Sequence, residues 1–195
     1  EDGVAVISWN MADRPMNVLN EQSVAMFKAA AEKALADPAV TGIIITSAKN
    51  DFLAGADLDR LADASDAAQV YAGMQGYQGL LRKLETGKKP VVAAINGTAL
   101  GGGYELALAC HRRIVADDAK IQLGLPEVLV GLMPGAGGTQ RLPRMIGARG
   151  ALPLMLEGRK LAPAAALKSG MVDQVVPREQ LLNAAKAWLA SKPEA

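Results

Sequence analysis

Residues 90–109 read PVVAAINGTALGGGYELALA, and this stretch decides the predicted fold class. Its apolar run through Ile95 has the continuous hydrophobicity of a strand that is covered on both faces. The glycine-rich segment 97–103 follows the strand and leads into an apolar helix that is predicted to begin near Tyr104. A strand that turns directly into a helix is typical of a parallel sheet with helical crossovers, so the stretch predicts an α/β protein.

The rest of the chain continues this alternation of strands and helices. Further strands are predicted at 3–9, 42–46, 113–116 and 121–123. Helices are predicted from a cap at Asn20 to about 38, from the turn at 54–56 to about 84, and after the loop at 133–138, where 175–177 separates two helices. No internal repeat or linker is visible, so residues 1–195 are predicted to form a single domain. The chain starts at its first strand and stops after its last helix, which predicts that both ends are cut.

The turns at 54–56 and 97–103 each follow a buried strand. The carboxyl ends of parallel strands share one edge of a sheet, and ligands of α/β proteins bind beyond that edge. We therefore expect both turns to lie together beside a ligand. Their glycines suit a backbone that approaches this ligand closely.

Composition and charge exclude several classes of protein. Half of the 195 residues are hydrophobic and 21% are charged, which suits a packed domain rather than a disordered chain. The 21 basic and 20 acidic residues leave a net charge of +1, too little for a nucleic-acid-binding surface. One Cys and one His can form neither an internal disulfide nor a four-ligand zinc site.

Targeting signals are also lacking in the sequence. No apolar run approaches the ~18 residues of a membrane span, and the first residues lack the basic start and apolar core of a signal peptide. No membrane span is therefore predicted. Together with the lone Cys, this favours the bacterial cytoplasm, with the mitochondrial matrix as the alternative.

The three glycines at 101–103 place backbone amides at the start of a helix, where the potential is positive. Such a turn suits either a bound phosphate or an oxyanion that forms during a reaction. The sequence disfavours phosphate, because neither 101–106 nor 135–140 completes a dinucleotide pattern and no Walker loop is present. A Gly-x-Ser-x-Gly elbow for a hydrolase nucleophile is also absent.

Two glutamates are candidates for acid–base chemistry. Glu105 lies in the first turn of the helix, where a carboxylate can simply complement the helix dipole, although that role does not require three glycines. Glu127 lies between apolar residues and is either an exposed loop residue or a carboxyl group with a raised pKa in a dry pocket. If the two converge beside oxyanion-binding amides, they suit proton transfer next to a carbonyl group. Their spacing leaves open whether they meet.

Other notable side chains are interpreted as structural. Cys110 and His111 lie near a helix end without an Asp or Asn spaced for a triad, so a structural or surface role is predicted. Met133 and Met145 are predicted to fill the core.

Four segments resemble the signature motifs of the crotonase (enoyl-CoA hydratase/isomerase) family, and they occur in the family's order: 52–58, 96–107, 125–127 and 134–143. They are spread over most of the chain, which makes the match highly specific. The sequences LGLPE at 123–127 and GGTQRLPR at 137–144 are most similar to the hydratase portion of multifunctional fatty-acid oxidation proteins.

The resemblance implies a reaction and the residues that perform it. The activity implied is the hydration of 2-enoyl-CoA in fatty-acid β-oxidation, with the thioester oxygen bound by the amides of Ala56 and Gly102. Glu105 and Glu127 are implied to hold and activate the water that adds to C3, with Glu127 as the proton donor to C2. The implied substrate-binding residues are Ala54, Ala56, Asp57, Leu58, Asp59 and Gly102, with the backbone of 57–59 along the CoA moiety. Acyl-CoA is the substrate, and no cofactor or metal is implied.

The resemblance also implies an architecture and an assembly. The fold expected is a superhelix of repeated strand-strand-helix (ββα) units that lacks the family's last C-terminal helices. A homo-oligomer is expected, a trimer in family terms, or a thiolase-type partner if the chain belongs to a multifunctional protein with 3-hydroxyacyl-CoA dehydrogenase activity. Two alternatives stay open, a 3,2-enoyl-CoA isomerase and a truncated module that binds acyl-CoA without turnover.

Overall fold

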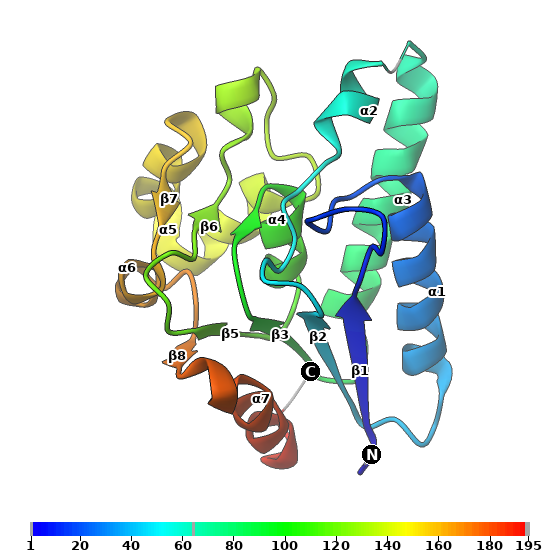
Figure 1. Ribbon diagram of the computed structural model, residues 1–195, viewed down its shortest axis with the longest axis vertical. Helices are drawn as coiled ribbons and strands as arrows, with labels where there is room; N and C mark the ends of the chain where they lie inside the picture. The colour runs from blue at the N-terminus through cyan, green and yellow to red at the C-terminus, as the bar shows by residue number, and fades with distance from the viewer. Residues whose placement is uncertain (1, 64, 194–195) are drawn as a thin grey trace.

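A five-stranded parallel sheet runs through the centre of the molecule (Figure 1). The computed structural model describes residues 2–63 and 65–193. The strands, in spatial order, are β1 (Val4–Trp9), β2 (Gly42–Ser47), β3 (Val91–Ile95), β5 (Arg112–Ala116) and β8 (Gln174–Val176). A smaller sheet contains β4 (Ala99–Leu100), β6 (Leu123–Gly124) and β7 (Lys160–Leu161).

The order of the strands in space follows their order in the chain, so each new strand joins the same edge of the main sheet. Two consecutive units have the order strand, strand, helix. In the first, β3 and β4 lead into α4 (Gly102–Leu108); in the second, β5 and β6 lead into the 3₁₀ helix η1 (Glu127–Val130) and then α5 (Gly138–Leu156). Because β4 pairs with β6, successive units also stack through the small sheet. The predicted α/β superhelix is confirmed.

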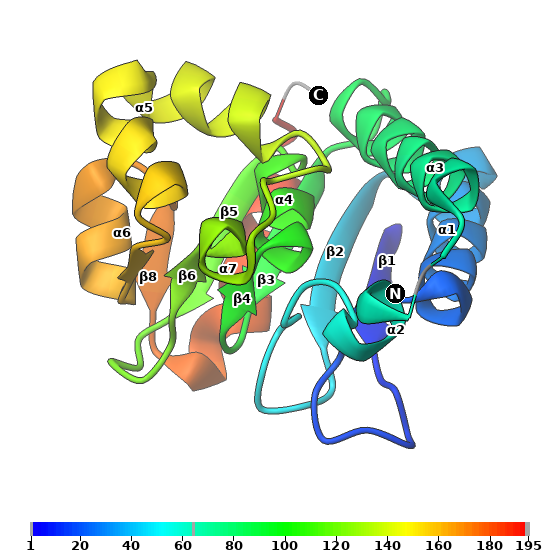
Figure 2. The ribbon, with the colours of Figure 1, turned by 90° about the horizontal axis from the view of Figure 1, so that it is seen from above.

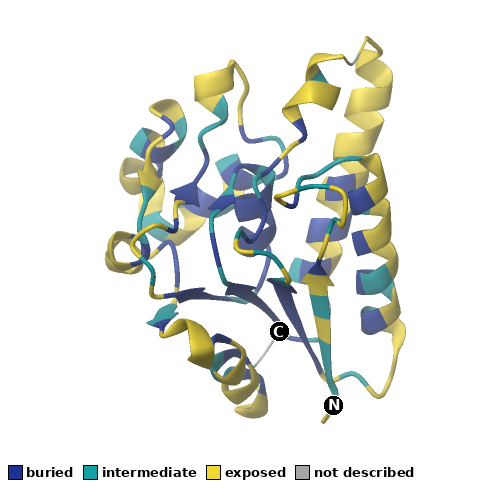
Figure 3. Ribbon diagram, in the orientation of Figure 1, coloured by how far each residue is buried: buried dark blue, intermediate teal, exposed yellow. Residues whose placement is uncertain are grey.

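Helices cover both faces of the main sheet, which explains the continuous apolar runs of its strands. In Figure 1, α4 lies above β3 and β5, while α7 (Leu181–Ala190) lies below them. All five residues of β3 are buried, and Figure 3 shows the same for the middle of the sheet. The apolar sequence of this strand is therefore the one expected for a layer without a solvent face.

The remaining helices flank these layers. Figure 2 shows α1 (Glu21–Ala36) and α3 (Ala67–Glu85) side by side at one end of the sheet, with α5 and α6 (Pro163–Ser169) at the other. Asn20 caps α1 as predicted, because its side chain accepts a hydrogen bond from the Ser23 amide. Within the described residues, no helix combines the length and the apolar character that a membrane crossing requires.

Two local predictions are wrong, and one strand was not predicted. The polar stretch after the 54–56 turn is two helices, α2 (Leu58–Ala62) and α3, and Asp66 caps the second through the amides of Ala68 and Gln69. Residues 175–177 do separate two helices, α6 and α7, but the separator includes an unpredicted strand, β8, which pairs with β5. Met133 and Met145 do not fill the core, since they are 71% and 36% exposed.

Gly103 lets α4 pack closely against the segment that precedes the first glycine turn. A Cβ on Gly103 would lie 2.2 Å from the backbone oxygen of Leu53, a distance that only a shift of the backbone could relieve. At Gly76, on the exposed side of α3, the same position has no atom within 4 Å beyond its chain neighbours and the backbone of its own helix. The two glycines therefore form a matched pair, one required by packing and one not.

We expect Gly103→Ala to lower the free energy of unfolding by about 3 kcal/mol, because it overpacks a buried contact. Gly76→Ala should raise it by about 0.5 to 1 kcal/mol, because alanine is the better helix former. Urea denaturation followed by circular dichroism measures both. Equal stability of the two variants would contradict the close packing of α4 on Leu53.

Candidate active site

The two glycine turns lie against each other. Gly55 and Gly101 both have positive φ, at 93° and 53°, which few other residues adopt. A Cβ on Gly55 would lie 2.9 Å from the oxygen of Leu100 and 3.6 Å from the amide nitrogen of Gly102. The prediction that the turns after β2 and β3 share one edge of the sheet is confirmed.

Two backbone amides at this junction are free to bind a ligand. Leu19 pairs with the residues on either side of Ala56, accepting from the Asp57 amide at 2.9 Å and donating to the Gly55 oxygen at 2.7 Å. The Ala56 amide takes no part in this pairing. Within residues 2–63 and 65–193, neither this amide nor that of Gly102 donates a hydrogen bond to another group of the chain.

Glu105 is buried in α4 and held through one carboxyl oxygen. Its side chain is 2% exposed, and Oε1 accepts hydrogen bonds from the amides of Ala136 at 2.8 Å and Gly138 at 2.7 Å. Burial raises the pKa of Glu105, while the two amides act in the opposite direction. The other oxygen, Oε2, lies 3.9 Å from the position that a Cβ on Gly102 would take, so it faces the glycine turn.

Glu127 approaches the same turn from η1. Its Oε1 lies 3.4 Å from the position that a Cβ on Gly101 would take. Both of its carboxyl oxygens are buried, and neither has a hydrogen-bond partner among the described residues. Burial raises its pKa to about 7; its own backbone amide acts in the opposite direction, and the negative charge of Glu105 adds to the increase. The two predicted carboxyl groups therefore converge on the Gly101–Gly102 turn, which their sequence spacing had left open.

The other predicted binding residues follow the first turn towards the surface. The Ala54 amide donates to the Asn17 oxygen at 2.9 Å, so it is engaged inside the protein. The Asp57 side chain is also buried and forms an ion pair with Arg14 at 2.8 Å. Leu58 and Asp59 are exposed residues at the start of α2.

Cys110 and His111 have the structural surroundings that their positions suggested. The Val91 amide donates to Nδ1 of His111 at 3.0 Å, which connects the end of α4 to β3. Cys110 is buried, and burial raises the pKa of its thiol to about 12. Over the described part of the chain, His, Cys, Asp and Glu side chains form no group of three or more that could hold a metal ion.

The chain matches the family model described as enoyl-CoA hydratase/isomerase over residues 1–193. It belongs to the enoyl-CoA hydratase/isomerase family. A curated relative, the fatty acid oxidation complex subunit alpha of Shewanella putrefaciens, is 44% identical over 186 residues. That match includes 95% of this chain but only 26% of the relative, so the chain spans about a quarter of the relative's length.

Solved structures of the family have the same fold. An enoyl-CoA hydratase from Bacillus anthracis superposes with a TM-score of 0.89 at 36% identity, covering 97% of this chain and 72% of that one. A probable enoyl-CoA hydratase/isomerase from Mycobacterium abscessus superposes with a TM-score of 0.87 at 28% identity, covering 98% and 72%. The crotonase resemblance that the four motifs indicated is confirmed.

Sequence reasoning missed the groups that hold Glu105 in place. The amides of Ala136 and Gly138 were assigned only to a loop before a helix, although the glycines at 135–138 signal a close backbone approach. Tyr77 was also missed; its hydroxyl donates to the Gly102 oxygen at 3.2 Å, from α3. No pattern within α3 indicates this contact, because it joins residues 25 positions apart.

Proposed function

We propose that this chain hydrates 2-enoyl-CoA thioesters. One observation carries the proposal: two buried carboxyl groups converge on a glycine turn that also presents a free backbone amide. A second free amide, that of Ala56, belongs to the adjoining turn. Amides of this kind stabilise a thioester oxygen as it gains negative charge, and paired carboxyl groups move the protons.

The reaction then proceeds with one proton taken and one given. Water bound between the glutamates loses a proton to the Glu105 carboxylate as its oxygen bonds to C3. The electron pair of the C2–C3 double bond moves through the carbonyl carbon to the thioester oxygen, where the amides of Ala56 and Gly102 stabilise it. As the carbonyl re-forms, C2 takes the proton of Glu127. The product is a 3-hydroxyacyl-CoA, and a proton returned from Glu105 to Glu127 restores the starting state.

The surroundings of the two carboxyl groups support this division of roles. The amides of Ala136 and Gly138 favour the ionised form of Glu105, which a base requires. Glu127 receives no hydrogen bond from the amides of that loop, and its pKa of about 7 leaves a large share of it protonated at neutral pH, as an acid requires. The different surroundings of the two carboxyl groups therefore favour Glu105 as the base and Glu127 as the acid.

The wider role follows from the relatives and stays a proposal. The name of the Shewanella relative indicates fatty-acid oxidation, and we infer the same pathway for this chain. The backbone of 57–59, of which Leu58 and Asp59 are exposed residues, is the proposed contact for the CoA moiety. A homo-oligomer, a thiolase-type partner, the absence of a cofactor and a cytoplasmic location remain predictions.

An isomerase is the second candidate, because the same site could move a proton from C2 to C4 of a 3-enoyl-CoA. The unpaired carboxyl group of Glu127 is the observation that favours it. We expect a 2-enoyl-CoA to be hydrated at least tenfold faster than a matched 3-enoyl-CoA is isomerised. Absorbance of the conjugated thioester measures both rates. Faster turnover of the 3-enoyl substrate would assign the chain to isomerisation instead.

The raised pKa of Glu127 gives a pH dependence. We expect kcat/KM for hydration to fall as the pH rises through about 7, because the acid loses the proton that it gives to C2. Activity below that pH depends on Glu105 remaining ionised. Initial rates across a buffer series measure the profile. A constant kcat/KM from about pH 6 to 8.5 would contradict the assignment of Glu127 as the acid.

A further inference from the structure

The loop at 134–138, which holds Glu105, is itself held from its other side by Arg141. This residue lies in the first turns of α5, and its side chain is 12% exposed. Its Nη1 donates to the Ala136 oxygen at 2.9 Å, so the peptide units on both sides of Ala136 are fixed. The Ala136 amide donates to Glu105, and its oxygen accepts from Arg141.

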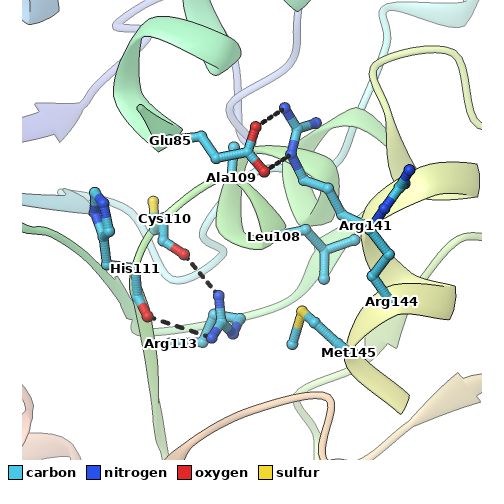
Figure 4. Close-up of a pocket in the computed structure, with 9 residues that line it drawn as sticks. All are labelled: Glu85, Leu108, Ala109, Cys110, His111, Arg113, Arg141, Arg144 and Met145. Carbon is cyan, nitrogen blue, oxygen red and sulfur yellow. Dashed lines mark hydrogen bonds and ion pairs between the residues drawn. The ribbon is translucent and has the colours of Figure 1, made fainter. Parts of the chain in front are cut away.

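Arg141 is anchored in turn by Glu85 at the end of α3. Nε and Nη2 donate to the two carboxyl oxygens of Glu85, each at 3.1 Å, which is a two-pronged pair. Figure 4 shows this pair at the edge of a cavity of about 270 Å³, with Arg144 and Met145 beside it. The guanidinium therefore links α3 to the loop through three hydrogen bonds.

Gly137 indicates how closely Arg141 packs against the loop. A Cβ on Gly137 would lie 2.2 Å from Nη1 of Arg141. Gly137 also has a φ of 107°. The loop therefore needs glycine both for its backbone conformation and for the guanidinium that lies against it. The loop and the Arg141 side chain therefore restrict each other's position.

We propose that Arg141, anchored by Glu85, is a positioning residue that holds the loop amides of Ala136 and Gly138 in place for Glu105. The inference rests on the proposed function, in which Glu105 is the base. In this proposal Arg141 acts on the reaction through the loop. A base held by two amides keeps one oxygen fixed and presents the other to the reacting water.

The charge of Arg141 has a second effect on the same carboxyl group. It lowers the pKa of Glu105, against the larger effect of burial. Within the described residues, the other ionisable groups that interact with Glu105 are Tyr77 from α3 and Glu127 from η1. Neither is a cation, so Arg141 is the charged group whose removal should move the ionisation of the base to higher pH.

Arg141→Gln tests the inference, with Arg144→Gln as the matched control. Arg144 lies one turn further along α5, lines the same cavity and, among residues 2–63 and 65–193, forms hydrogen bonds only with Gln140. We expect Arg141→Gln to lower kcat for but-2-enoyl-CoA about tenfold to a hundredfold, with KM changed less than about threefold. The acid limb of its kcat profile should move to higher pH. Arg144→Gln should change neither.

A conservative variant separates geometry from charge. Arg141→Lys keeps the cation but not the two-pronged pair with Glu85. We therefore expect it to keep the acid limb near its original pH while recovering only part of kcat. Thermal unfolding of each variant, together with rates corrected for the folded fraction, removes the contribution of stability.

The outcomes are distinct from those that test the function itself. Activity of Arg141→Gln equal to that of Arg144→Gln, or a loss confined to stability or KM, overturns the positioning role. Glu105→Gln is measured in parallel. If it retains full activity, the proposed function fails whatever Arg141 shows. If it loses activity while Arg141→Gln does not, only the positioning role fails.

Discussion

Glu105→Gln is expected to lower kcat for the hydration of but-2-enoyl-CoA about a thousandfold. Positioned acid–base groups contribute roughly 10²–10⁴ to a rate, and the amide side chain cannot take a proton from water. The glutamine oxygen can still accept from the amides of Ala136 and Gly138, so the fold should be retained. Steady-state rates at saturating substrate measure the loss.

Glu32→Gln is the control for this change. It makes the same replacement on α1, where Glu32 forms an exposed ion pair with Lys83 away from the glycine turns. We expect its kcat to be unchanged. If Glu105→Gln also stays within threefold of the parent protein, the base assignment is wrong.

Gly102→Pro should lower kcat by roughly 10²–10³, because it removes one of the two proposed oxyanion donors. Proline lacks the backbone N–H, and Gly102 is the first residue of α4, a position where proline fits a helix. The helix should therefore form, and the effect should appear in the rate. Circular dichroism and initial rates together measure both parts.

Gly102→Ala is the matched control for the proline. A Cβ at this position would lie 2.5 Å from Cδ1 of Leu19, so both variants displace that side chain, but only proline removes the amide. The ratio of their rates isolates the hydrogen bond. Equal rates in the two variants would show that the Gly102 amide stabilises no charge in the reaction.

The fold was predictable where the residues of an element themselves carry a clear strand, turn or helix pattern. The strand and the helix of 90–109 were predicted, because a buried strand needs continuous apolar residues and a close turn needs glycine, but the short strand β4 between them was not. Strand β8 was not predicted, because three residues carry too little pattern and its partner β5 is about 60 positions away. The exposed Met133 was misplaced for a related reason, since its type indicates apolarity and not position.

The candidate site shows the same limit. Glu105, Glu127 and Gly102 could be selected from residue type and context, but their meeting depends on the stacking of successive ββα units. Arg141 stood within a family motif, yet its role depends on a partner in α3 and on a loop oxygen. Contacts of this kind join distant parts of the chain and leave no periodic signal.

The position of the thioester oxygen in a bound acyl-CoA tests the proposed chemistry most directly. A crystal structure with a saturated acyl-CoA, which binds but cannot be hydrated, would locate it. We predict that this oxygen lies about 3 Å from the amide nitrogens of both Ala56 and Gly102, with C2 and C3 between Glu105 and Glu127. A thioester oxygen bound elsewhere, with both amides facing solvent, would contradict the proposed chemistry.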